Sequence, residues 1–96
     1  MSNNDIQITT SNGHTQPDRL PMSKEQNDQA DWLSGTGENF TVIFKDGSPF
    51  TKHTFTINPG QPTPSGTIRP DAELREYKYE VHGPGGFTDP TIIIQR

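Results

Sequence analysis

The chain has 96 residues, of which 26% are hydrophobic, and its 12 acidic and 8 basic residues give a net charge of −4. This length allows one domain with a modest core, and the scattered basic residues exclude the clustered positive charge that nucleic-acid binding needs. No apolar run is long enough to span a membrane, and the absence of cysteine excludes disulfides and thiolate metal ligands.

The N-terminal segment, residues 1–4, is polar and carries nothing to bury, so we expect it to be mobile. It also lacks the basic and apolar regions of a signal peptide, which favours a cytoplasmic location. We expect residues 5–96 to form a single domain that follows this mobile segment.

Nine prolines and nine glycines divide the chain into pieces too short for ordinary helices, while twelve threonines and eight isoleucines favour strands. We expect one helical turn at residues 71–75 and a short strand at Thr67–Ile68. Seven or eight short strands at regular spacing predict an all-β sandwich, with antiparallel or mixed sheets. The main predicted strands are Ile6–Ile8, Leu20–Ser23, Gln29–Leu33, Phe40–Phe44, Thr54–Ile57, Tyr77–Val81 and Ile92–Ile94.

The last third of the chain has the clearest strand pattern, and we expect it to form a β-hairpin with a flexible glycine-rich tip at residues 83–86. Period-2 alternation places Tyr77, Tyr79 and Val81 on the inner face, with the charged residues between them facing outward. The final strand should bury its residues 92 and 94 in the same core. Trp32, the only tryptophan, should lie buried between the sheets.

This closing segment resembles the closing hairpin of the cupredoxins, in which a Tyr-x-Tyr-x-Cys strand precedes a loop with further copper ligands. Here Tyr77-Lys78-Tyr79-Glu80-Val81 is similar to that strand, with Val81 in the place of the cysteine. Asn39 and Phe40 stand where the resemblance would place the first histidine ligand. The resemblance therefore implies a cupredoxin-like sandwich without type 1 copper, because such a site needs a thiolate and two imidazoles.

An immunoglobulin-like sandwich is the alternative fold, because a tyrosine two residues before a cysteine position is also typical of that class. Trp32 is compatible with both folds. The sequence leaves this choice open.

The three histidines, His14, His53 and His82, are the candidate metal ligands, but no two of them have close ligand spacing. We therefore expect no bound cofactor and no metal site. No residue pattern indicates a catalytic site, so the protein is not expected to be an enzyme.

Two loops, residues 46–53 and 82–89, are the candidate binding loops, because each holds a phenylalanine among glycine, proline and threonine. Their candidate residues are Phe50, His53, His82 and Phe87. The leading hypothesis is a non-enzymatic binding or interaction module on a copper-free scaffold, with a protein partner and with neither nucleic acid nor membrane. The alternative is a histidine-based metal-binding or electron-transfer protein.

Overall fold

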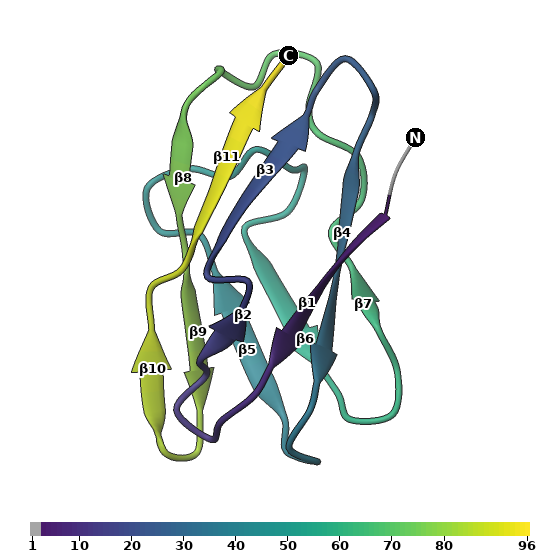
Figure 1. The fold of residues 1–96 in the computed structure, drawn as a ribbon. Coiled ribbons are helices and arrows are strands. Elements are labelled where there is room, and N and C mark those ends of the chain that lie inside the picture. The colour runs from purple at the N-terminus through teal and green to yellow at the C-terminus, as the bar shows by residue number, and fades with distance from the viewer. Residues whose placement is uncertain (1–2) are drawn as a thin grey trace.

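A computed structural model describes residues 3–96, which form eleven strands and no helix. The strands pair into a mixed β-sandwich, so the predicted fold class is confirmed (Figure 1). Within these residues, no helix has the length and apolar composition needed to cross a membrane. The strands are β1 Asn3–Ile8, β2 Thr15–Gln16, β3 Arg19–Ser23, β4 Gln29–Ser34, β5 Phe40–Ile43, β6 Thr54–Ile57, β7 Thr63–Pro64, β8 Glu76–Lys78, β9 Glu80–Gly83, β10 Gly86–Thr88 and β11 Thr91–Gln95.

Three groups of hydrogen-bonded strands surround the core, in the orders β2-β1-β4-β7, β10-β9-β5-β6 and β3-β11-β8. Two of the pairings are parallel, β1 with β4 and β11 with β3, and the others are antiparallel. Parallel neighbours require long crossover connections, which is why segments far apart in the sequence become neighbours here.

Strand β1 begins within the N-terminal segment, residues 1–4, that we expect to be mobile. Asn3 and Asn4 are the first two residues of β1 and pair with Gln29 and Ala30 of β4. The backbone of β4 offers them hydrogen-bonding partners, which the polarity of their side chains does not reveal. Residues 1–2 lie outside the described residues, and the mobility that we expect of them stays a prediction.

The inward register of the closing strands is confirmed. Tyr77, Tyr79, Val81, Ile92 and Ile94 are all buried. A shift by one residue would have buried charged side chains instead, so the alternation of the sequence selects this register.

The pairing of the closing strands differs from the simple hairpin that we expected. β8 pairs with β11, but after Tyr79 the chain enters another sheet, where β9 pairs with β5 and β10. Figure 1 shows β8 and β9 following one another almost in line. The glycine-rich segment is therefore a tight turn between β9 and β10 and not the tip of a hairpin that ends in β11. Asp89–Pro90 then leads the chain back to the sheet that contains β8, where it forms β11.

Two smaller predictions are wrong. Residues 71–75 form turns and bends without a helix, and Thr67–Ile68 is not a strand. The short strand lies earlier, at β7, where Thr63 pairs with Trp32. Local propensity is a weak guide in these segments, since Ile68 and Ala72 are buried by tertiary contacts.

The centre of the core is an aromatic cluster around Trp32, which is fully buried as predicted. Its ring centroid lies 4.8 Å from that of Phe55 and 5.7 Å from that of Tyr79, and the indole N–H donates to the Tyr79 hydroxyl at 3.3 Å. Burial raises the pKa of the Tyr79 phenol far above its ordinary value, against a smaller opposing effect of this hydrogen bond. The phenol therefore stays neutral and holds Trp32 in one orientation.

Candidate functional site

Two of the residues at positions that the cupredoxin resemblance assigns to copper ligands, Phe40 and Val81, have apolar side chains. Phe40 and Val81 are both buried on the neighbouring strands β5 and β9. A Cβ atom built on Gly83 would lie 2.5 Å from a Phe40 ring carbon, so the ring occupies the space over this glycine. The residues at this end of the sandwich do not fit a copper ion.

The turn between β1 and β2 closes the same end of the molecule. Gly13 lies against the backbone of Val81, the amide of Gly85 donates to the Ser11 carbonyl at 2.9 Å, and the Thr88 hydroxyl donates to the Gly13 carbonyl at 2.6 Å. These contacts join the N-terminal turn to the β9–β10 hairpin. Figure 1 shows both turns at the lower end of the sandwich.

The three histidines do not form a metal site. His82 lies on β9, His14 precedes β2, and His53 precedes β6, where its carbonyl accepts from the Phe44 amide at 2.8 Å. Across residues 3–96, no three His, Asp or Glu side chains gather closely enough to hold a metal ion.

The two loop phenylalanines have opposite environments. Phe50 is fully buried in the aromatic cluster, 6.3 Å from Trp32 between ring centroids, so its ring is enclosed in the core. The ring fills the end of a core that has few large apolar groups. Arg69 holds the backbone of this loop, because its guanidinium donates to the carbonyls of Ser48 and Phe50.

Phe87, in contrast, is 59% exposed and lies on β10 directly across from His82 on β9. The two rings are stacked, with centroids 5.0 Å apart and planes inclined by 17°. Most exposed apolar side chains on a protein need no explanation. This one differs because a neighbouring side chain fixes the plane of its ring.

The imidazole of His82 is itself held in place. Its Nε2 lies 2.7 Å from Glu80 Oε1, and Lys45 Nζ lies 3.3 Å from the other carboxylate oxygen. The hydrogen bond from His82, with a further contribution from Lys45, holds the pKa of Glu80 below its ordinary value, so the carboxylate stays charged. We call the stacked Phe87 and His82 rings, with Glu80 behind them, the Phe87 platform.

A polar cavity of about 460 Å³ adjoins this platform. It is lined by Phe87 and the residues that follow it on one side, and by residues before and at the start of β3 on the other. The parallel pairing of β11 with β3 brings these sides together, and the Thr91 amide donates to the Asp18 carbonyl at 2.8 Å. The lining residues are His14, Thr15, Asp18, Arg19, Phe87, Thr88, Asp89, Pro90 and Thr91.

Sequence reasoning named Phe87 and His82 as candidates but did not predict the cavity beside them. Asp18 and Thr15 are about seventy positions from Phe87, and no local pattern links them. Only the strand order reveals that they line one cavity.

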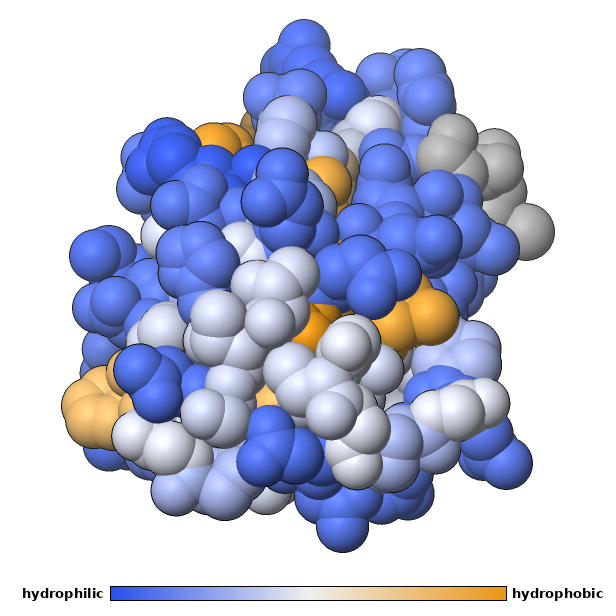
Figure 2. Space-filling view, turned by 60° about the horizontal axis from the view of Figure 1, so that its bottom comes forward, coloured by the Kyte–Doolittle hydropathy of each residue, from blue (hydrophilic) through white to orange (hydrophobic). Residues whose placement is uncertain are grey.

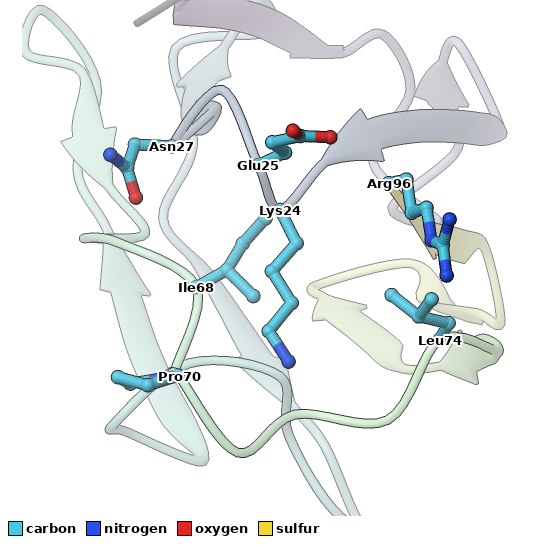
Figure 3. Close-up of a pocket in the computed structure, with 7 residues that line it drawn as sticks. All are labelled: Lys24, Glu25, Asn27, Ile68, Pro70, Leu74 and Arg96. Atoms are coloured by element: carbon cyan, nitrogen blue, oxygen red, sulfur yellow. The ribbon is translucent and has the colours of Figure 1, made fainter.

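A second cavity, of about 580 Å³, lies at the opposite end, near the C-terminus. Figure 3 shows Leu74 and Arg96 on one side of it, Ile68 and Pro70 on the other, and Lys24 between them. The Lys24 ammonium already donates to the Ala72 carbonyl at 2.7 Å, which reduces its availability to a ligand.

The surface around the β9–β10 end is mostly hydrophilic or neutral, and its hydrophobic areas are small and separate (Figure 2). Recognition there would rest on one fixed ring and on polar groups rather than on a broad apolar face.

No protein-family model and no curated protein sequence matches this chain. Among solved structures, the chain is similar to an amicyanin mutant in its reduced state, with a TM-score of 0.67 and 12% sequence identity. The likeness covers 96% of this chain and 81% of the amicyanin chain. Amicyanin is a cupredoxin, and an identity this low concerns the fold alone. The chain therefore has a cupredoxin-like fold.

Proposed function

We propose that the protein is a non-enzymatic interaction module that binds a protein partner through the Phe87 platform. The observation that carries this proposal is the exposed Phe87 ring, which is fixed by stacking on His82 and borders a polar cavity. Rings of this kind serve as anchors in protein interfaces because they bury a large apolar area at little cost in conformational entropy. The scaffold supports the proposal, since β9 and β10 hold the platform on paired strands.

The alternative, a histidine-based metal-binding or electron-transfer protein, has less support. His14, His53 and His82 do not gather into a ligand set, and the chain has no cysteine. We therefore propose a cupredoxin-like fold whose function does not depend on copper.

Replacing Phe87 by alanine should weaken partner binding at least tenfold and leave the fold intact, because the ring is largely outside the core. In the measurement, the same protein mixture is passed over the immobilised full chain and over the immobilised Phe87→Ala variant, and the proteins that each one retains are compared. It is followed by titration of each purified candidate. We expect one partner whose affinity falls at least tenfold, as for other anchor residues.

Leu74→Ala is the matched control, because Leu74 is 51% exposed and lies in the other cavity. A partner that is lost with Leu74→Ala and kept with Phe87→Ala would contradict the proposal and move the interface to the opposite end. Both variants should melt close to the unmodified protein, which checks that neither effect comes from unfolding.

Stoichiometric Cu(II) should produce no intense blue band and no narrow copper hyperfine splitting. The colour of a type 1 site comes from a copper–thiolate bond, and this chain cannot form one. Visible absorption and EPR spectra of the titrated protein test this prediction. A tight one-to-one complex that His53→Ala or His82→Ala abolishes would instead support the metal-binding alternative.

A further inference from the structure

Strand β10 lies at an open edge of its sheet. In the order β10-β9-β5-β6, β9 is the one described strand that pairs with it, and Figure 1 shows β10 at the outer side of the sandwich. Phe87 and Thr88 of this strand line the polar cavity, so β10 borders there on open space. An open edge presents backbone donors and acceptors that can pair with a further strand.

The pairing of β9 with β10 shows which backbone groups point outward. Gly83 and Gly86 pair across a two-residue turn, and such a closing pair exchanges its backbone hydrogen bonds. Antiparallel pairs alternate, so the next pair, Phe87 with His82, is not hydrogen-bonded, which agrees with the close approach of its two rings. The N–H and C=O groups of Phe87 therefore point away from β9, and within residues 3–96 neither group has a hydrogen-bond partner.

The other five sheet edges of the described residues carry features that hinder pairing. β3 and β7 each contain a proline, β8 has a charged residue at each end, and β2 has two residues and is followed by a proline. On β6, the Thr56 carbonyl already accepts from the Thr63 hydroxyl at 3.0 Å. Prolines and charges are common protection against the pairing of edges. β10 has neither, and its central side chain, Phe87, is exposed.

We propose that β10 pairs antiparallel with β10 of a second copy of this chain, which names the partner of the Phe87 platform and so rests on the proposed function. A two-fold axis beside Phe87 would place this residue opposite its equivalent, and the two residues would exchange both backbone hydrogen bonds. Gly86 of each copy would lie opposite Thr88 of the other, so no like charges meet. The two four-stranded sheets would then form one continuous sheet.

The side chains favour a second copy over an unrelated strand. The Phe87 ring already stacks on His82 of the neighbouring strand. Two-fold pairing would place the two Phe87 rings side by side, so that a row of four rings would cross the joined sheets. Cross-strand aromatic pairs of this kind stabilise antiparallel sheets. The acid beside each His82, Glu80, is already paired with Lys45, so its charge is compensated within each copy.

Sedimentation equilibrium of the full chain between about 10 μM and 1 mM tests this inference. We expect a reversible monomer–dimer equilibrium with a dissociation constant on the order of 100 μM, because β10 is short and the contact is small. Phe87→Lys should remove the dimer, since it places like charges opposite each other. Leu74→Lys makes the same change of charge at the opposite end and should keep the dimer. A chain that stays monomeric at about 1 mM, or equal loss of the dimer in both variants, would overturn the inference.

Amide hydrogen exchange then locates the contact. The Phe87 amide points outward in the monomer, so its exchange should slow as the dimer forms, by about twofold where half of the chains are paired. The Gly86 amide bonds within the hairpin and should exchange at the same rate at every concentration. A dimer whose Phe87 amide keeps the exchange rate of the monomer would show that another surface pairs, and the inference would be wrong.

The two proposals can fail separately. If the chain stays monomeric but Phe87→Ala loses a different protein, then the partner is not a second copy and this inference alone is wrong. If the dimer forms through β10 but Phe87→Ala binds the second copy and every other partner as tightly as the unmodified chain, then the ring is not an anchor and the interaction-module proposal fails.

Discussion

Replacing Trp32 by alanine should lower the free energy of unfolding by about 3–5 kcal/mol, as for other large-to-small changes in a core. The ring is fully buried and contacts Phe44, Phe50, Phe55 and Tyr79. The substitution also leaves the buried Tyr79 hydroxyl without its donor, which adds to the loss. For a domain with a total stability of about 5–15 kcal/mol, such a loss could leave the chain largely unfolded.

Urea denaturation and thermal denaturation, each followed by circular dichroism, measure this effect. Leu33→Ala is the control on the same strand, because Leu33 lies on the opposite face of β4 and is partly exposed. We expect it to cost about 1 kcal/mol or less. A Trp32→Ala variant that melts within a few degrees of the unmodified protein would show that the aromatic cluster is not the centre of stability.

Replacing Gly13 by alanine should destabilise the protein by about 2–4 kcal/mol, from two causes that act together. Gly13 has a φ of 88°, a conformation that favours glycine, and a Cβ atom there would lie 2.4 Å from the Val81 carbonyl oxygen. The clash is with the backbone of a central strand, so a side-chain rotation cannot relieve it. The β1–β2 turn would have to move away from the β9–β10 hairpin.

Gly37→Ala separates these two causes. Gly37 has a similar φ of 82°, but a Cβ atom there would meet nothing within 4 Å. Its expected cost is therefore the conformational part alone, about 1 kcal/mol. Equal destabilisation by the two variants, measured by the same denaturation, would mean that the turn is not packed against Val81.

The β9–β10 end is closed by the packing of the described residues. The Phe40 ring lies over Gly83, and the Gly13 turn lies against Val81. Burial of the apolar groups stabilises this end of the sandwich. The binding groups that we propose lie outside this packed region, on the outer face of the hairpin and at its edge.

Three features could be predicted from the sequence alone, namely the all-β class, the inward register of Tyr77, Tyr79 and Val81, and the burial of Trp32. These features depend on local alternation and on the scarcity of large apolar groups, both of which can be read without knowing the pairing partners. The lack of a type 1 copper site follows from composition alone, because no arrangement of this chain contains a thiolate.

The tertiary structure alone decided which strands pair and which loop residues are exposed. Phe50 and Phe87 have similar neighbours in sequence, yet one ring fills the aromatic cluster and the other stacks on the surface. The cavity has the same origin, since Asp18 and Asp89 become neighbours only through the parallel pairing of β3 with β11. Strand pairing and the exposure of loop residues depend on the free energy of the whole packed chain. The local sequence around each residue contributes only a small part of that free energy.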